Sequence, residues 1–442
     1  MHRMRRLFLF FVTLVAAPQA FADATAFVNV NVIPMTSEVV LPAQTVVVEE
    51  GVITAIGNVD VVPVPENAEI VDGTDRYLMP GLTEMHGHVT GTGDDQIRRL
   101  FSLFLANGVT TVRGMLGRPS HLRLREDIAA GKVFGPRLIT SGPSFNGNSV
   151  TSAEQGVRMV REQHAAGYDF LKIHPGLSKV EFEAIADTAN EIGIPFSGHV
   201  PVATGIDGAL EKGMASIDHL DGYMASLLPQ NTDTSGGYGG FFDVMLADQV
   251  IEERIADVVA ATLAAGVANV PTESLFEQVV NDVPPADLGN RAEMRYVPAA
   301  TVRQWERAKE ETLGERGFNP EVAARAIEIR RRLILALHEA GAAILLGSDA
   351  PQIFNVPGFS LHHELEFMVS SGLTPFEALQ TGTVAPARFF GIGTGVVAVG
   401  RIGDLVLLDA DPIADIANSR RVHGVLAAGR WSTAEDLLAI LD

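Results

Sequence analysis

Cysteine is absent from this chain of 442 residues, and basic residues are in a minority. Without cysteine the protein can form no disulfide and no thiolate zinc site, and it can carry no lipid on cysteine. Lysine and arginine total 33 against 54 aspartates and glutamates, which gives a formal net charge of −21. Such a charge repels nucleic acids and anionic membranes, so we expect neither as a partner. The sequence is 47% hydrophobic and has no fixed-period repeat, which is typical of a globular protein.

The first 22 residues have the order of an export signal. Three arginines among the first six residues precede an apolar run over 7–17, and Ala20-Phe21-Ala22 follows. The run is too short for a finished membrane anchor, and a buried first helix is the alternative. We therefore predict a signal peptide over 1–22, a periplasmic or secreted location, and no membrane contact after cleavage.

Both ends of the remaining chain contain short valine-rich runs that are typical of strands. The runs are Ala26–Ile33, Thr45–Glu49, Val52–Ile56 and Ala68–Val71 near one end, and Val396–Val399, Asp404–Leu408 and Val422–Ala428 near the other. Two unrelated β tails would leave exposed strand edges on each. We therefore predict that residues 23–77 and 391–442 form one small β-sandwich together.

Residues 78–390 alternate strand-like and helix-like segments, which indicates parallel βα units. Eight candidate strands end near His88, Arg113, Ser141, His174, Val200, Leu220, Thr272 and Asp349. A closed (β/α)8 barrel needs eight strands, so the predicted fold class is α/β with a TIM-type barrel. Long intervals predict insertions at about 221–260 and 274–338, which form either a lid or a packing subdomain remote from the site.

Metal-ligand side chains stand at the ends of several of these strands. His86 and His88 are two residues apart, so both can point to one side of a strand and bind one metal. Lys172 lies in an apolar run, where burial lowers the pKa of its amine and lets the neutral form react with CO2. The resulting N6-carboxylated lysine has two oxygens, one for each of two divalent metal ions.

His199, His219 and Asp349 complete the predicted set. The two histidines can bind the second metal, and Asp349 can bind the first. A water between two metals loses a proton near neutral pH and can attack a carbonyl carbon. Asp349 is the predicted proton shuttle, because a carboxylate there can take the proton of this water and pass it to the leaving amine.

The ordered set of motifs resembles the amidohydrolase superfamily, in its branch of imidazolonepropionase-like and prolidase-like exported hydrolases. The resemblance covers nearly the whole chain after residue 22. Its motifs are Met79–Glu84 with His86-Gly87-His88, Lys172, Gly198-His199, Asp218-His219, Gly347-Ser348-Asp349-Ala350, Ser360–Leu365, Gly372–Pro375 and Gly400–Leu405. The resemblance implies a barrel with an appended sandwich, usually two zinc ions, and a carboxylated Lys172 between them.

Three further residues are candidates for binding substrate. Arg113 can bind a substrate carboxylate or close the barrel electrostatically, and the acid that the family often has after this arginine is replaced here by Gly114. His174 shares the side of Lys172 and either touches substrate or caps a loop. His362 can line the pocket or lie at the surface.

The leading functional prediction is a metal-dependent hydrolase that cleaves the amide or peptide bond of a dipeptide or an N-acyl amino acid. The same site could hydrolyse a lactone, a cyclic imide or a phosphotriester, since the same hydroxide attacks each of these centres. A non-catalytic metal-binding or solute-binding protein is the alternative from another class. The expected partner is a small molecule, and a homo-oligomer is compatible with the sequence.

Overall fold

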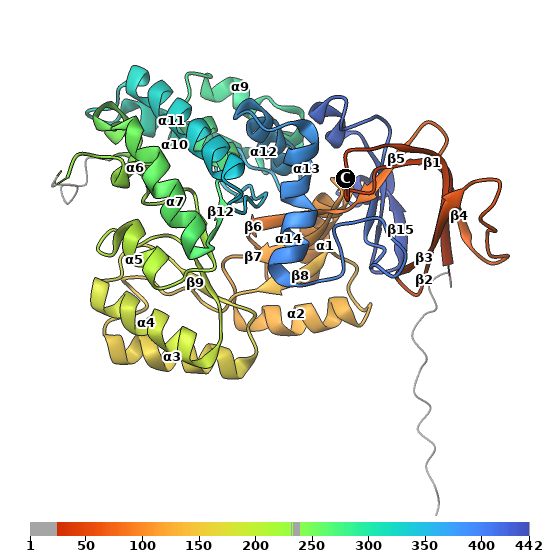
Figure 1. Cartoon of the computed structure of the whole chain (residues 1–442), viewed down its shortest axis with the longest axis horizontal. Helices are drawn as coiled ribbons and strands as arrows, with labels where there is room; N and C mark the ends of the chain where they lie inside the picture. Colours follow the sequence, from red (N-terminus) through yellow and green to blue (C-terminus); the bar gives the residue numbers. More distant parts are fainter. Residues whose placement is uncertain (1–23, 231, 233–238, 442) are drawn as a thin grey trace, which may run out of the picture.

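The computed structural model describes residues 24–230, 232 and 239–441. The predicted signal peptide over 1–22 lies outside these residues. Among the helices of the described ranges, none is both long and apolar enough to cross a bilayer. Figure 1 shows two parts, a helix-rich part that surrounds short parallel strands and a sheet built from both chain ends.

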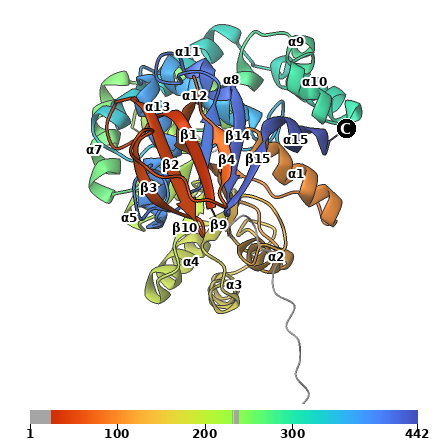
Figure 2. The ribbon, with the colours of Figure 1, turned by 90° about the vertical axis from the view of Figure 1, so that its right-hand side faces the viewer.

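The end sheet combines eight strands from the two ends of the chain (Figure 2). They are β1 (Ala24–Val32), β2 (Leu41–Glu49), β3 (Val52–Asn58), β4 (Glu69–Asp72), β5 (Tyr77–Pro80), β13 (Leu405–Leu408), β14 (Val422–Ala427) and β15 (Arg430–Thr433). β5 joins the two ends, because it pairs in parallel with β1 and antiparallel with β13. Apolar side chains such as Phe27, Leu405 and Leu426 form its core, where the Phe27 ring meets Trp431 edge-on at 5.3 Å.

The prediction of a strand over Val396–Val399 is wrong, because the structure has no strand there. Gly395 and Gly400 flank the segment with left-handed backbone, φ +82° at both, so the chain turns at each end of it. The arrangement of the end sheet as a two-layer sandwich stays a prediction.

Seven parallel strands form the centre of the helix-rich part, in the pairing orders β6-β7-β8 and β9-β10-β11-β12. They are β6 (Leu82–Gly87), β7 (Val109–Gly114), β8 (Arg137–Thr140), β9 (Leu171–Ile173), β10 (Phe196–Gly198), β11 (Ser216–Asp218) and β12 (Ala268–Val270). Each coincides with a predicted strand.

The predicted eighth strand appears only as isolated parallel bridges. Ile344 pairs with Asn269 of β12, and Ala350 pairs with Gly87 of β6. Asp349 has φ +61°, a left-handed backbone that interrupts a regular strand. Another parallel bridge, between Ser141 and Phe170, links the ends of β8 and β9.

Amphipathic helices cover the parallel strands (Figure 1). In α4 (Lys179–Ile192) the residues Phe182, Ile185, Ala186 and Ala189 are buried, which is the spacing of one helical face. Ser178 caps its first turn, and Gly193 ends it with φ +77°. The other helices between the parallel strands are α1 (Asp94–Ala106), α2 (Pro119–Ala129), α3 (Ala153–Ala166), α5 (Gly205–Glu211), α6 (Tyr223–Ser226) and α7 (Ile255–Ala265).

The two predicted insertions are largely helical. Residues 221–260 include the 3-10 segment η1 (Phe241–Gln249), and residues 233–238 before it lie outside the described ranges. The second predicted insertion, 274–338, corresponds closely to the segment from α8 to α11, which consists of α8 (Glu273–Val280), α9 (Pro285–Gly289), α10 (Ala299–Gly314) and α11 (Pro320–Glu339). After residue 350 follow α12 (Phe359–Ser370), α13 (Pro375–Gly382), α14 (Val384–Phe390), η4 (Ile416–Arg420) and α15 (Ala434–Ala439).

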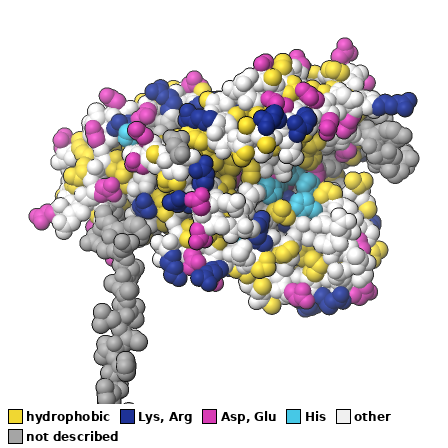
Figure 3. Space-filling view, turned by 180° about the vertical axis from the view of Figure 1, so that it is seen from behind, with side chains coloured by type: hydrophobic (Ala, Val, Ile, Leu, Met, Phe, Trp, Pro, Cys, Tyr) yellow, Lys and Arg dark blue, Asp and Glu magenta, His cyan; other side chains and the backbone are white. Residues whose placement is uncertain are grey.

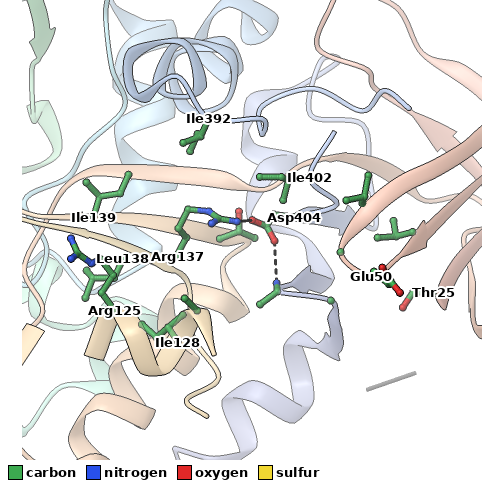
Figure 4. A pocket seen from close by; sticks show the side chains of 17 residues that line it. Thr25, Glu50, Arg125, Ile128, Arg137, Leu138, Ile139, Ile392, Ile402 and Asp404 are labelled. Carbon is green, nitrogen blue, oxygen red and sulfur yellow. Dashed lines mark hydrogen bonds and ion pairs between the residues drawn. The ribbon is translucent and has the colours of Figure 1, made fainter. Parts of the chain in front are cut away.

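A cavity of about 700 Å³ lies between the end sheet, α2 and the start of β8. Arg137 of β8 and Asp404, which precedes β13, form a 3.1 Å ion pair inside it (Figure 4). Thr110 at the start of β7 also lines the cavity. The cavity therefore lies at the amino ends of the parallel strands.

Candidate active site

Six side chains predicted as metal ligands converge at the carboxyl ends of the parallel strands. His86 lies in β6 and Lys172 in β9. Three histidines directly follow the ends of β6, β10 and β11, namely His88, His199 and His219, and Asp349 directly precedes the bridged residue Ala350. Carboxyl ends of parallel strands meet at one edge, which explains why residues up to 263 positions apart are neighbours. Figure 3 shows histidine side chains gathered in a hollow of this face.

Asp349 lies among three of the histidines. Its Oδ1 is 2.6 Å from His88 Nε2 and 3.6 Å from His86 Nε2, and its Oδ2 is 3.8 Å from His219 Nδ1. His86, His219 and Asp349 offer three donor atoms that lie within 4.8 Å of one another. Nitrogen and carboxylate oxygen donors at this spacing suit a divalent transition metal.

Lys172 is wholly buried beside His86, with 3.4 Å between its Nζ and His86 Nε2. Burial lowers the pKa of Lys172 to about 8, although the carboxylates of Asp218 and Asp349 oppose this shift. Gly198 makes room for the lysine, since a Cβ there would lie 2.9 Å from Lys172 Cδ and 2.4 Å from Ile173 O. The amine is therefore available in its neutral form near neutral pH.

His199 and His219 stand next to each other, with their ring centroids 4.5 Å apart. His199 Nδ1 lies 2.7 Å from Asp221 Oδ2, and His219 Nδ1 lies 2.8 Å from Thr272 Oγ1. His219 Nε2 is buried and has no hydrogen-bond partner among the described residues. A buried polar atom without a partner is costly, so a bound metal ion is the occupant that this nitrogen fits.

Burial lowers the pKa values of His86 and His219 well below that of a free imidazole. Both imidazoles are therefore neutral at physiological pH, which is the form that binds a metal. The donor set thus fits a metal centre in charge as well as in geometry.

Two buried acids that the sequence analysis did not assign hold His86 in place. Asp218 Oδ2 lies 2.8 Å from His86 Nδ1, and Glu84 accepts hydrogen bonds from the backbone nitrogens of His86 and Ser348. Burial raises the pKa of Glu84 to about 7. The available signal was their position in apolar strands, Glu84 two residues before His86 and Asp218 directly before His219.

Arg113, for which the sequence left two roles open, has a side chain that is only 1% exposed. It donates hydrogen bonds to Met85 O, Ser216 Oγ and both carboxylate oxygens of Asp218. This is the alternative role, electrostatic closure inside the strand layer. Such a charge is paired rather than free because an unpaired buried guanidinium would be costly.

His362, another candidate for binding substrate, has both ring nitrogens engaged elsewhere. His362 is buried in α12 and contacts Ser419 Oγ at 3.0 Å and Asn107 O at 3.2 Å. It joins helices on the outside of the parallel strands and does not reach the histidine cluster.

His174 remains beside the site. Its ring stacks on His199 with centroids 5.2 Å apart, and it lines a pocket of about 630 Å³ with Ser144 and Asn146. Phe242, which the sequence analysis did not single out, stacks on His219 with centroids 5.0 Å apart. The first insertion therefore contributes an aromatic wall to the site.

Comparisons with known proteins identify the family to which this chain belongs. Residues 77–432 match the amidohydrolase family. A curated enamidase from Eubacterium barkeri is 24% identical over 398 residues, which cover 88% of this chain and 86% of the enamidase.

Two solved structures are also similar to this chain. A bottromycin amidohydrolase has 25% identity and a TM-score of 0.71, over 95% of this chain and 89% of its own. A Xaa-Pro dipeptidase with bound methionine in its active site has 19% identity and a TM-score of 0.66, over 93% of this chain and 100% of its own. From the extent of the family match, this chain belongs to the amidohydrolase family of metal-dependent enzymes and is a hydrolase of carbon–nitrogen bonds.

Proposed function

We propose that the protein cleaves the amide bond of a small substrate, a dipeptide or an N-acyl amino acid, at a centre of two divalent metal ions. The observation that carries the proposal is the contact set of Asp349 with His86, His88 and His219 beside a buried Lys172. The similarity to a Xaa-Pro dipeptidase supports a peptide-like substrate. Zinc is the proposed metal because imidazole and carboxylate donors suit it.

The proposed centre divides the six ligands between two ions. His86, His88 and Asp349 would hold the first, and His199 and His219 would hold the second. Lys172, N6-carboxylated by CO2, would join them, since its lowered pKa leaves the amine reactive. When bound, the two ions supply Lewis acidity toward the scissile carbonyl and toward water.

Asp349 is the proposed proton carrier of the reaction. Its carboxylate would take a proton from the attacking water and deliver it to the leaving nitrogen, which then departs as an amine. Its backbone conformation, φ +61°, aims the carboxylate at the histidines and is rare for a residue other than glycine. His174 and Phe242 would contact the substrate beside this carboxylate.

Two further parts of the proposal concern architecture and location. We propose that β6 to β12 and the bridged segment at 344–350 form a closed (β/α)8 barrel, which the bridges at both ends of that segment support. We also propose export to the periplasm or the medium, because of the residue order over 1–22. Fractionation of cells that express the full chain would test the location.

The function is tested by chelation and metal add-back on the purified protein, with dipeptides, N-acyl amino acids and lactones as substrates. We expect chelated protein to lose its activity and Zn²⁺ to restore it, with amides cleaved faster than lactones.

Lys172→Ala should abolish activity, since the shared ligand is lost. Lys309→Ala is the matched control, because Lys309 is a buried lysine that bonds Gln278 O and Asn281 Oδ1 outside the site. Full activity of Lys172→Ala, or of metal-free protein, would contradict the proposal.

A further inference from the structure

Arg330 reaches from insertion helix α11 to the ends of two neighbouring parallel strands. It donates hydrogen bonds to His219 O at 2.9 Å, just after β11, and to Pro271 O at 3.1 Å, just after β12. Its Nε also donates to Glu273 Oε1 at 2.8 Å. The Arg330 side chain is 3% exposed, and its Cζ lies 4.1 Å from the centroid of the Phe276 ring. Four partners on three segments fix its position.

The two carbonyls that Arg330 binds flank the contact that orients His219. His219 Nδ1 lies 2.8 Å from Thr272 Oγ1, and both residues have left-handed backbone, φ +65° and +55°. Residues with a Cβ rarely adopt this conformation, so it persists only where the surroundings enforce it. Arg330 bonds the carbonyl of His219 itself and the carbonyl directly before Thr272.

This arrangement leaves one particular nitrogen of His219 free. Because Thr272 occupies Nδ1, the other ring nitrogen, Nε2, is the atom that is buried and unpartnered among the described residues. Groups that hold a metal-binding histidine by its second nitrogen set its orientation and its affinity for the metal. Arg330 does not touch the His219 ring nitrogens. It bonds the backbone that carries the His219–Thr272 contact.

The opposite side of the same turn is also held. Glu364 of α12 accepts hydrogen bonds from the backbone nitrogens of Glu273 and Ser274, at 3.0 and 2.6 Å. The start of α8 is thus fixed from α12, while Arg330 fixes the strand ends from α11. Only a guanidinium supplies donors in a planar fork that can bond two carbonyls and a carboxylate at once, which a lysine ammonium on a flexible chain cannot match.

We propose that Arg330 is a positioning residue that holds His219 in the orientation that binds metal. Through Arg330 the second insertion, at about 274–338, would stabilise the geometry of the metal site. This inference rests on the proposed metal site. It assigns the insertion neither of the two roles expected from the sequence, a lid or a remote packing subdomain.

The test compares Arg330→Lys with Arg331→Lys by measuring Zn²⁺ affinity through competition with a chromogenic chelator. Arg331 is the next residue of α11 and is also paired with a glutamate, Glu277 at 2.6 Å, but it contacts neither strand end. We expect Arg330→Lys to bind Zn²⁺ at least tenfold more weakly than the wild type. Arg331→Lys should stay within twofold of the wild type.

Equal Zn²⁺ affinity of Arg330→Lys and the wild type would overturn the inference, and so would an equal loss in both variants. If Arg330→Lys does not fold, the double variant Arg330→Gln with Glu273→Gln replaces it, because it leaves no lone buried charge. The same tenfold loss is expected there, and wild-type affinity would overturn the inference. A wild-type protein without Zn²⁺ affinity would overturn the proposed function itself, and this inference with it.

Discussion

At the scale of single residues, the proposed mechanism gives Asp349 two tasks, as a metal ligand and as the proton carrier. It lies 2.6 Å from His88 Nε2, which leaves its second oxygen toward His219. An asparagine at this position has nearly the same shape but cannot take up a proton.

We predict that Asp349→Asn lowers kcat by about 10²- to 10⁴-fold at saturating Zn²⁺, which is the usual contribution of a positioned acid–base group. Steady-state kinetics on the best amide substrate would measure it, with bound metal quantified in the same sample. Asp404→Asn, in the remote cavity, is the control. A kcat within tenfold of the wild type would show that Asp349 does not carry the proton.

Much of the site could be predicted residue by residue, because strand-end position and ligand chemistry are both visible in the sequence. His86 and His88 follow from the two-residue period of a strand, and Lys172 from its apolar neighbours. The sequence left two roles open for Arg113, since its partner Asp218 lies 105 residues away and could not be identified. Arg330 and Phe242 could not be predicted either, because they reach the site from insertions that contain no local motif.

At the scale of secondary structure elements, buried polar side chains join helices that are distant in sequence. His362 of α12 contacts Asn107 O, at the end of α1, and Ser419 Oγ in η4. Burial lowers the pKa of His362 to about 3, so the folded protein holds this imidazole neutral. The unfolded chain binds its proton below about pH 6.5.

At His362 the folded protein therefore binds fewer protons than the unfolded chain between about pH 3 and 6.5. We predict that His362 makes the free energy of unfolding fall as the pH drops below about 6.5, by up to roughly 1.4 kcal/mol per pH unit. Urea unfolding between pH 7 and 5 would measure this slope.

His362→Gln should reduce the slope, because an amide does not titrate in this range. His164→Gln on α3, an exposed histidine, should leave the slope unchanged. Identical slopes for the wild type and His362→Gln would show that His362 is not the group responsible.

Element positions were more predictable than element boundaries. The seven parallel strands coincide with predicted ones because each is a short apolar run between turn residues. The eighth segment keeps only bridge pairing, and Asp349 within it leaves the extended backbone. A candidate site residue thus departs from the local pattern on which the strand prediction depended.

At the scale of the whole molecule, the proposed metal ions would connect segments from residue 86 to residue 349. A ligand that binds only the folded state stabilises it by about 2.7 kcal/mol at a free concentration one hundred times its Kd. The six predicted ligands come from five segments that are far apart in the sequence, so an unfolded chain cannot offer them together.

We predict that removing metal lowers the melting temperature and that added Zn²⁺ restores it in a concentration-dependent way. Scanning calorimetry of the holoprotein, of the chelated protein and of the reloaded protein would measure the shift. Lys172→Ala should show a much smaller metal-dependent shift than the wild type. A melting temperature independent of metal in the wild type would contradict a metal centre that spans the strands.

The pairing of β5 with β13 has a consequence for how the protein is made on the ribosome. Leu78 is opposite Leu407, more than 300 residues later, so one edge of β5 stays open until nearly the whole polypeptide has been synthesised. During that interval the amino-terminal strands expose an apolar hydrogen-bonding edge, which is a template for aggregation. Shortened chains that end before residue 405 would keep this edge of β5 uncovered permanently. In the full chain, chaperones or rapid synthesis and release of the last forty or so residues would determine the fraction of molecules that reach the native state.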